Sequence, residues 1–483
     1  MNKLINKLEK HHLKPSSGGS IPLSALPQAP PNQRDIYKYR FQTGVNLGGW
    51  FILEKWIAPS MHKFNKSDDD SEYAAVSGAV NVDGPEKAAA MWDHHYDSFV
   101  TEQDWKWLQD NHVNSVRVPL GFFCLGEEFT KGTPFSSVAT VYKNAWKKYK
   151  AMIELAGRYK IGVLIDIHAL PGGANPDSHS GIKGGGKFFQ TSSHVSLGLK
   201  CVAFIAKEVQ KIDNVIAIQI VNEASWDAPA ESYYTNALKR VREIDPTQNV
   251  VISDAWNRGK YSDFVKDKPG MIVDTHVYKC FSDDDNKKRP QQLIKDIRDG
   301  EWFTSSIIIG EFSCVMSGNS WGNISEHDRA GLKREFGCAQ INSFVQKSAG
   351  FYFWTYKFEE GPGGEWDFRQ MVKENCLPLP KRMGKHVSNG DQECKEMLGG
   401  HVYYWDNNSK DKMEHWRYEE GFKTAWKDAS AFYAFDESWI GQKETWRNAR
   451  REQHVAHKKN SQYVWEFDQG FDAGLNRFMD QIR

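Results

Sequence analysis

The sequence predicts an α/β protein, a (β/α)8 TIM barrel followed by a C-terminal extension that is expected to be helical. Three observations predict this fold: eight short β-rich runs recur along the chain, helix-like or irregular stretches separate them, and polar residues stand at the carboxyl ends of the runs. The length of 483 residues suggests about three domains, but barrels with insertions exceed about 400 residues as one unit.

The eight β-rich runs alternate with helix-like sequence in the way that a barrel requires. Several runs are almost continuously apolar, which is typical of parallel strands covered on both faces. Helix-like sequence such as residues 145–160 lies between them. The runs span residues 43–51, 115–122, 162–169, 215–223, 250–255, 271–278, 306–312 and 350–356. Eight such alternations predict eight parallel strands closed into a barrel.

Composition divides the chain into three parts. Residues 1–39 are expected to form an extended lead-in, because residues 15–35 are rich in Pro, Ser and Gly. The predicted barrel occupies residues 40–380, and residues 381–483 form a charged and aromatic extension whose Trp side chains suit core and docking positions better than sugar stacking. Near the end of this extension, helical spacing predicts a helix packed on the barrel, with an apolar face of Phe471, Leu475, Phe478, Met479 and Ile482.

Charge balance and hydropathy exclude several classes of function. Lys plus Arg and Asp plus Glu number 62 each, which argues against a broad surface for nucleic acid or anionic lipid. No window has the ~18 to 20 apolar residues of a membrane span, so stable membrane insertion is not expected. The N-terminus has no apolar run of signal-peptide length, and the seven cysteines are scattered. We therefore expect a cytoplasmic protein; residues 4–13 resemble a mitochondrial presequence only weakly.

Polar or ionisable side chains stand at the carboxyl ends of seven runs. In a barrel these ends open on one face, where the active sites of this fold are built. A single His or Arg in such a place is more often a satisfied capping or loop residue, but seven strand ends that behave alike predict a functional site. The residues are Asn46, Arg117, His168, Asn222, Glu223, His276, Tyr278, Glu311 and Trp354.

Two of these residues, Glu223 and Glu311, end apolar runs. A buried carboxylate is costly, so it is either paired structurally or held for chemistry. The fourth and seventh strands lie across a barrel from each other, so the two carboxyls would flank one bond. Such a pair suits retaining hydrolysis of a glycosidic bond, in which carboxyls about 5 to 5.5 Å apart act as acid/base and as nucleophile.

The neighbouring residues divide the two roles. Asn222 would bind the sugar hydroxyl next to the anomeric carbon, which makes Glu223 the acid/base. Arg117 and Tyr278 would keep Glu311 ionised and oriented, which makes it the nucleophile. An apolar platform and two hydroxyl partners for the sugar would come from Trp354, His168 and His276.

Other motifs carry less weight. Residues 181–187, GIKGGGK, lack the spacing of a phosphate-binding loop and follow no strand directly, so we interpret them as a flexible loop at the site. Neither HExxH nor paired metal-ligand spacing is found among Asp166, His168, His179 and His276, so no metal or other cofactor is expected. No serine stands in a GxSxG context.

With these motifs, the sequence resembles glycoside hydrolase family 5, most closely its fungal exo-β-1,3-glucanase branch, as an intracellular relative. The likeness covers about residues 40–375 and implies a TIM barrel and retaining hydrolysis, with Glu223 as acid/base and Glu311 as nucleophile. The segments that carry it are GVNLGGWFILE (44–54), NSVRVPLGF (114–122), VLIDIHALPGGAN (163–175), VNEA (221–224), VDTHVY (273–278), IGEFS (309–313) and FYFWTYKFE (351–359).

The resemblance implies binding roles that spacing alone does not assign. Glu54, in the loop after the first strand, matches the residue that binds hydroxyls of the terminal glucose. Phe281 matches one half of an aromatic clamp at the entrance of this subsite, but Asp177 stands where secreted relatives carry the other half. The leaving-group side is therefore expected to differ from that of a β-1,3-glucan hydrolase. Further positions of the first sugar subsite are matched by Arg117, His168, Asn222, His276, Tyr278 and Trp354.

Three hypotheses for the function follow. The first is a retaining β-glucosidase or exo-β-1,3-glucanase acting on the terminal glucose of a β-glucoside or β-glucan. The second is a glycolipid β-glucosidase acting on glucosylceramide or a steryl glucoside. The third is a non-catalytic glycan-binding barrel, against which the retention of two costly carboxylates argues. The sequence makes no prediction for the oligomeric state.

Overall fold

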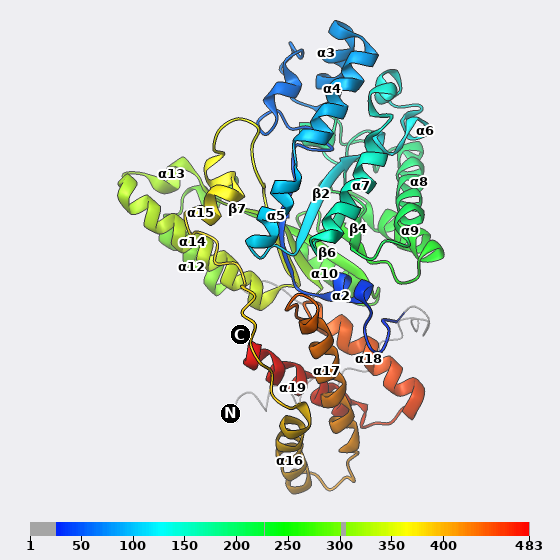
Figure 1. The fold of residues 1–483 in the computed structure, drawn as a ribbon, viewed down its shortest axis with the longest axis vertical. Helices are drawn as coiled ribbons and strands as arrows, with labels where there is room; N and C mark the ends of the chain where they lie inside the picture. The colour runs from blue at the N-terminus through cyan, green and yellow to red at the C-terminus, as the bar shows by residue number, and fades with distance from the viewer. Residues whose placement is uncertain (1–25, 227, 301–305, 483) are drawn as a thin grey trace.

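Eight parallel strands pair in sequence order and close into a barrel in the computed structural model, which describes residues 26–226, 228–300 and 306–482 (Figure 1). The last strand pairs with the first, Gln42 lying opposite Gly350. This architecture confirms the predicted (β/α)8 barrel. The strands are β1 (Gln42–Asn46), β2 (Ser115–Gly121), β3 (Gly162–Ala169), β4 (Val215–Gln219), β5 (Val250–Ser253), β6 (Met271–Lys279), β7 (Ile307–Met316) and β8 (Gly350–Phe353).

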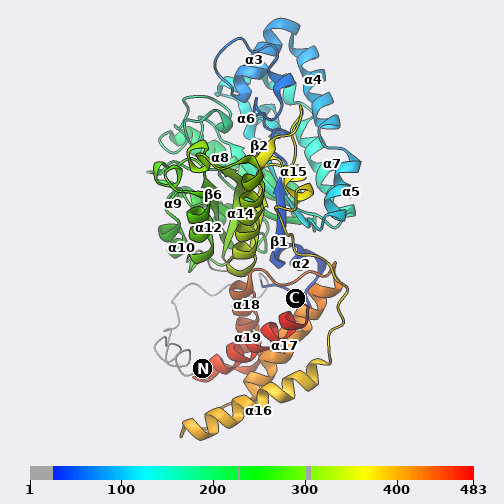
Figure 2. The same ribbon diagram turned by 90° about the vertical axis from the view of Figure 1, so that its left-hand side faces the viewer.

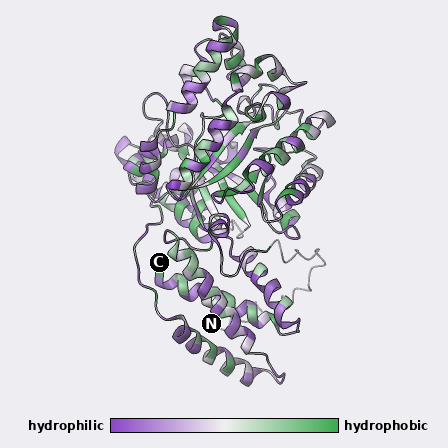
Figure 3. Cartoon of the chain, turned by 45° about the vertical axis from the view of Figure 1, so that its right-hand side comes forward, coloured by the Kyte–Doolittle hydropathy of each residue, from purple (hydrophilic) through white to green (hydrophobic). Residues whose placement is uncertain are grey.

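Most helices lie between consecutive strands and cover the outside of the barrel. Figure 3 shows hydrophobic residues concentrated on the strands and more hydrophilic ones on the outer helices. The helices after β1 to β8 are α3 (Glu72–Asp83), α4 (Pro85–Ser98), α5 (Glu102–Asp110), α6 (Glu127–Thr130), α7 (Ala145–Arg158), α8 (Ser192–Val209), α9 (Ala230–Ile244), α10 (Arg258–Val265), α11 (Asp283–Asn286), α12 (Pro290–Asp299), α13 (Gly318–Trp321), α14 (Glu326–Lys347) and α15 (Phe368–Lys373).

Five of the eight apolar runs extend beyond the carboxyl ends of the strands that they predicted, the runs at 43–51 and 215–223 by the most. β1 ends at Asn46, although Phe51 still forms an isolated bridge with Leu120, and β4 ends at Gln219. Residues after both strands, such as Leu47 and Val221, are nevertheless fully buried. Apolar sequence indicates burial rather than strand pairing. Here the chain stays buried after the hydrogen-bonded strand has ended.

The interior of the barrel has an apolar layer of side chains and, nearer the carboxyl ends of the strands, a polar layer. Side chains alternate along a strand, so Asp166 and Asp274 share the inner face with Leu164 and Ile272, two residues earlier on β3 and β6. The guanidinium of Arg117 lies among the polar side chains and is fully buried. The apolar layer is formed by Leu164, Ala217, Val251, Ile272, Ile308 and Tyr352.

An insertion after β1 covers the carboxyl end of the barrel. Its helices α3 and α4 project at the end of the molecule opposite α16 (Figure 2). The buried carboxylate of Glu72 holds it together by accepting hydrogen bonds from the backbone N–H of Leu53 at 2.7 Å and from the side chains of Trp92 at 2.9 Å and Tyr142 at 2.6 Å. The backbone N–H of Tyr73 donates to the carbonyl of Gly181 at 3.1 Å, so the insertion also fixes the loop after β3.

The C-terminal extension is a separate bundle of four helices with its own core. They are α16 (Gly390–Asn408), α17 (Trp416–Ala434), α18 (Lys443–Lys458) and α19 (Val464–Ile482). The predicted apolar face of α19 is buried, but mainly against α17 rather than against the barrel. The two helices are in backbone contact, because a Cβ on Gly470 would lie 2.0 Å from the carbonyl oxygen of Tyr418.

The bundle docks on the amino end of the barrel, opposite the insertion (Figures 1 and 2). The backbone N–H of Phe41, just before β1, donates to the carbonyl of Trp439 at 2.8 Å, and the two rings stack at 5.2 Å. Arg40 and Ile440 form an antiparallel bridge beside them. Because the active sites of such barrels lie at the carboxyl ends of the strands, the bundle supports the barrel from the far side.

The lead-in differs from the extended segment predicted for residues 1–39. Its last seven residues form helix α2 (Gln33–Tyr39), which starts at a capping box between Asn32 and Asp35. Residues 1–25, including the stretch 4–13, lie outside the described residues. In the part of the chain that the structure describes, none of the helices has the length and apolar character needed to cross a membrane.

Candidate active site

The carboxyl ends of the strands bring the two predicted glutamates together. One carboxylate oxygen of Glu223, one of Glu311 and a ring nitrogen of His276 all lie within 4.8 Å of one another. The other predicted strand-end residues surround this pair, as the contacts below describe. The sequence patterns therefore located a real cluster, although they did not reveal how each carboxylate reaches it.

A bulge in β7 turns Glu311 into the barrel. Thr275 of β6 lies opposite Ile309, but the next residue, His276, lies opposite Glu311, so Gly310 is an extra residue in the register. In a regular strand without this bulge, alternation would place Glu311 on the outer face with Ile309. Gly310 is also required by packing, because a Cβ there would lie 2.0 Å from a carboxylate oxygen of Asp274.

Glu311 is held by hydrogen bonds to both of its oxygens. The guanidinium of Arg117 donates to Oε1 at 3.0 Å, and the hydroxyl of Tyr278 donates to Oε2 at 2.7 Å. Nδ1 of His276 lies 3.4 Å from Oε2. These contacts are the ones predicted to orient this carboxylate.

Arg117 is the centre of the polar layer and fixes Asn222 as well. Its guanidinium donates to Oε1 of Gln219 at 2.8 Å and to Oδ1 of Asn222 at 2.7 Å. Burial disfavours the charged guanidinium, but Asp166, Glu311 and Asp274 outweigh this effect and raise the pKa of Arg117. Nδ2 of Asn222 lies 3.3 Å from Nε2 of His168, so one N–H of the amide makes this contact and the second N–H is the donor that can face a ligand.

Glu223 reaches the cluster from a strained position after β4. Its φ of +41° lies in the left-handed region, which costs a non-glycine residue about 1 to 3 kcal/mol and is typical of functional sites. Nδ2 of Asn175 donates to its backbone carbonyl at 2.9 Å. His276 Nδ1 lies 2.7 Å from Oε1, and His179 Nε2 lies 3.1 Å from Oε2.

These two histidines determine the charge of Glu223. Burial opposes its ionisation, but the hydrogen bonds from His179 and His276 outweigh burial and hold the pKa of Glu223 well below its usual range. Burial alone would lower the pKa of His179, yet Glu223, followed by Glu54 and Glu311, raises it to about 9. The pKa of His276 is raised well above its ordinary value, against burial, by Glu311, Asp274 and Glu223. In this arrangement the protons of the cluster reside on the two imidazoles.

Sequence reasoning did not assign catalytic roles to three residues of the cluster. Asp166 and Asp274 contact the rings of His168 at 2.7 Å and His276 at 3.1 Å. Strand alternation could have found both, because each aspartate stands two residues before its histidine. His179 comes from a 3₁₀ turn, Ser178–Ser180, in the loop after β3, where no periodicity identifies it.

Three predicted binding residues lie close to the cluster: Glu54, His168 and Trp354. Oε2 of Glu54 accepts from the indole of Trp56 at 2.9 Å, while its Oε1 is buried and has no hydrogen-bond partner among the described residues. Burial raises the pKa of Glu54, against the opposing effect of His168 and His179. The rings of His168 and Trp354 lie nearly parallel, with centroids 5.8 Å apart.

Exposed aromatic side chains lie around the cluster. Phe281 is 68% exposed and contacts Tyr278, with ring centroids 5.4 Å apart. Its aromatic neighbour on the other side is Trp366, from the segment after β8, at 6.1 Å. Asp177, at the expected position of the second clamp residue, is exposed. Three further exposed indoles come from the loops after β1, β4 and β5: Trp56, Trp226 and Trp256.

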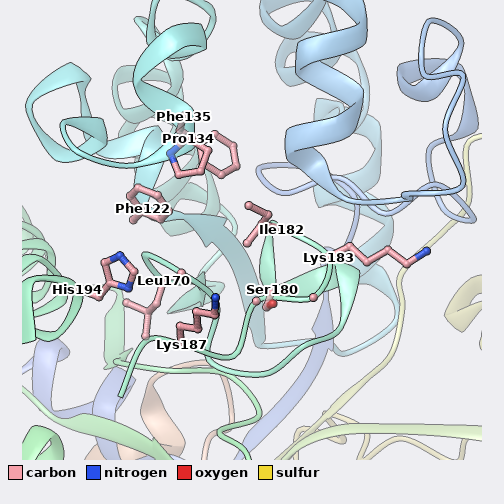
Figure 4. Close-up of a pocket in the computed structure, with 12 residues that line it drawn as sticks. Phe122, Pro134, Phe135, Leu170, Ser180, Ile182, Lys183, Lys187 and His194 are labelled. Carbon is pink, nitrogen blue, oxygen red and sulfur yellow. The ribbon is translucent and has the colours of Figure 1, made fainter. Parts of the chain in front are cut away.

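The GIKGGGK segment forms the wall of a separate cavity of about 200 Å³ next to the loop that carries His179 (Figure 4). Phe122, Phe135, Leu170 and Ile182 give it an apolar lining, and none of the predicted site residues takes part. Lys183 Nζ donates to the carbonyl of Asp68 at 2.7 Å. This contact is a second tether between the insertion after β1 and the loop after β3.

Comparisons with known proteins agree with this geometry. The family model described as cellulase (glycosyl hydrolase family 5) matches residues 70–360, and the model of the glucan 1,3-beta-glucosidase 3 C-terminal domain matches residues 387–482. An uncharacterised glycosyl hydrolase of Saccharomyces cerevisiae is 36% identical over 502 aligned positions, covering 99% of each chain. Glucan 1,3-beta-glucosidase 3 of Schizosaccharomyces pombe is 34% identical over 457 positions, covering 92% of this chain and 96% of its own.

Among solved structures, rutinosidase from Aspergillus niger has a similar fold. Its TM-score is 0.58 at 19% identity, and the match covers 71% of this chain and 99% of that chain. The match of the first family model to more than half of the chain, and the two relatives above 30% identity over nearly all of it, confirm the resemblance seen in the motifs. The chain belongs to glycosyl hydrolase family 5 and is a glycoside hydrolase with an additional C-terminal helical domain.

Proposed function

We propose that the protein is a retaining glycoside hydrolase that releases terminal β-linked glucose, with Glu311 as nucleophile and Glu223 as acid/base. The observation that carries this proposal is the proximity of the two carboxylates, whose nearest oxygens lie within 4.8 Å. Retaining enzymes separate the two carboxyls by about 5 to 5.5 Å, whereas inverting enzymes need about 6.5 to 9.5 Å to admit a water molecule.

In the first step, an oxygen of Glu311 attacks the anomeric carbon while the bond to the leaving oxygen breaks. Hydrogen bonds from Arg117 and Tyr278 hold the carboxylate of Glu311 in position for this attack. Glu223 gives a proton to the leaving oxygen, and the glucose becomes an ester of Glu311. In the second step, Glu223 removes a proton from water, and the water oxygen replaces Glu311 at the same carbon with the original configuration.

The neighbouring histidines, His179 and His276, supply the proton that Glu223 donates. The low pKa of Glu223 means that it must take up a proton before it acts as an acid. His179, 3.1 Å from Oε2, is protonated up to a pH of about 9 and is the nearer of the two to solvent. We assign His179 the role of a positioning residue that holds this proton.

His179→Asn should therefore change the pH profile of hydrolysis. The wild-type kcat/KM for a β-glucoside with a poor leaving group should fall above a pH of about 9, as the proton on His179 is lost. The variant should lack this limb and lose activity, with about a tenfold reduction on the poor leaving group and little on an activated aryl glucoside. Identical profiles for the two proteins would contradict the role of His179.

The terminal sugar is proposed to be glucose, bound by Glu54, Asn222 and the platform of Trp354. Oε1 of Glu54 is a buried acceptor without a partner among the described residues, so a hydroxyl of the sugar would satisfy it. The names of the relatives in the comparisons, glucan 1,3-beta-glucosidases among them, support a glucan or glucoside substrate.

A specific observation favours a second candidate, a glucolipid substrate. Loops that follow the barrel strands carry four exposed aromatic side chains: Trp56, Trp226, Trp256 and Phe281. Exposed apolar surface of this kind suits an apolar leaving group as well as the face of a sugar. The exposed Asp177 in place of a second clamp aromatic also points away from a polymeric β-1,3-glucan.

A substrate panel tests the proposal. Purified full-length protein is incubated with β-1,3-, β-1,4- and β-1,6-linked glucosides and with glucosylceramide and a steryl glucoside in detergent. We expect release of glucose that appears first as the β-anomer in proton NMR spectra. First appearance of the α-anomer would refute the retaining mechanism, and cleavage confined to either glucosides or glucolipids would select between the two substrate classes. The cytoplasmic location remains a prediction from the sequence.

A further inference from the structure

A cluster of two histidines and a glutamate lies in the C-terminal bundle, outside the active site. His401 comes from α16, His415 stands directly before α17, and Glu466 lies in the first turn of α19. Oε2 of Glu466 is 2.9 Å from Nε2 of His401 and 2.8 Å from Nδ1 of His415. The cluster therefore joins three segments of the bundle.

Glu466 needs a positive charge that the protein does not supply through Lys or Arg. Its side chain is 0% exposed, and its only ion-pair contacts among the described residues are with the two histidines. A buried carboxylate without a Lys or Arg partner is compensated by a protonated imidazole or by a metal ion.

The contacts of His415 bear on whether an imidazole proton or a metal ion compensates Glu466. Nδ1 faces Glu466, and Nε2 lies 3.1 Å from Oδ1 of Asp406. A neutral imidazole has one N–H and can satisfy only one of these carboxylates. A metal ion on Nδ1 would leave Nε2–H to donate to Asp406, which is the usual partner arrangement of a metal-binding histidine.

We propose that His401 Nε2, His415 Nδ1 and Glu466 Oε2 bind a divalent transition metal ion of the zinc class, with solvent as the fourth ligand. Bonds of about 2.0 to 2.1 Å in a tetrahedron separate the ligand atoms by roughly 3.3 Å, so each histidine nitrogen needs to move away from Oε2 of Glu466 by only about half an ångström. The three ligand atoms already lie within 4.8 Å of one another. Two imidazoles and one carboxylate are a donor set that suits such ions.

Neighbouring residues already orient two of the ligands. The ring of His401 stacks on Tyr418 with centroids 4.0 Å apart, and Oε1 of Glu466 accepts from the backbone N–H of Glu414 at 2.7 Å. The catalytic cluster also gathers three possible ligands, but there the guanidinium of Arg117 contacts Glu311 at 3.0 Å and opposes a cation. No Lys or Arg in the described part of the chain forms such a contact with Glu466.

The experiment uses full-length protein, stripped with a chelator and then titrated with zinc chloride. We expect about one zinc ion per chain and a rise in the thermal midpoint of unfolding, because a ligand that binds only the folded state stabilises it. His401→Gln and Glu466→Gln should lose this zinc, and Asp406→Asn should weaken its affinity about 10- to 100-fold. His457→Gln, on an exposed histidine of α18, is the matched control and should bind like the wild type.

The outcome is read from zinc content, calorimetry and circular dichroism, which verifies that each variant is folded. Equal zinc binding by the wild type and His401→Gln would overturn the proposal, as would the absence of binding to the wild type. In the second case the cluster is a hydrogen-bonded group of side chains without a metal ion. Hydrolysis of β-glucosides should be unchanged in Asp406→Asn, because the bundle docks away from the catalytic cluster.

Discussion

Replacing Glu311 by Gln should reduce kcat for an aryl β-glucoside by roughly 10⁴-fold or more, equivalent to a barrier increase of at least about 5.5 kcal/mol. The amide has nearly the same shape, so its oxygen can accept from Arg117 while its nitrogen donates to the hydroxyl oxygen of Tyr278, but the neutral amide cannot act as a nucleophile. The loss should appear equally with good and poor leaving groups, because both need the attack by Glu311. Initial rates with the two classes of substrate measure it.

Covalent trapping tests the same assignment without turnover. An activated 2-deoxy-2-fluoroglucoside should add one fluoroglucosyl group to the wild type, visible by intact mass and located on Glu311 by peptide mapping. Glu311→Gln should show no added mass, whereas Glu360→Gln, in the exposed loop after β8, should label like the wild type. Labelling of another residue, or near-normal turnover by Glu311→Gln, would refute Glu311 as nucleophile.

The barrel was predictable because its strands are buried on both faces. Runs such as residues 162–169 are mostly apolar, and β3 has the same bounds in the structure. The polar residues that alternate with them on the inner face, including Arg117 and His168, were predictable for the same geometric reason. The apolar pattern does not determine which residues pair across neighbouring strands. The bulge at Gly310 and the end of β4 at Gln219 are therefore visible only in the structure.

His179 shows why part of the site escaped prediction. Its place beside Glu223 depends on the loop after β3, which the insertion holds through the bonds from Tyr73 to Gly181 and from Lys183 to Asp68. These contacts join segments about a hundred residues apart and follow no local periodicity. The docking of the C-terminal bundle escaped for a related reason: helical spacing identifies the apolar face of α19 but not the element that covers it.

Replacing Glu223 by Gln should have an effect that depends on the leaving group. Loss of the acid should lower the rate with a poor leaving group by about 10²- to 10⁴-fold. A dinitrophenyl glucoside needs no proton, so it should still form the ester with Glu311, release one equivalent of phenol in a burst and then stall, because no base activates water. A uniform loss with both leaving groups and no burst would contradict the role of Glu223 as acid/base.

Azide supplies the decisive second measurement on Glu223→Gln. A small anion needs no general base, so azide should restore turnover of the dinitrophenyl glucoside and yield the β-glucosyl azide, the configuration expected from attack on an ester of Glu311. The same variant removes the carboxylate that raises the pKa of His179, while burial continues to lower it. His179 should therefore lose its proton well below a pH of about 9, and NMR titration of its ring should show that shift. Rescue without the shift would leave the acid/base role intact and place the proton reservoir on His276 alone.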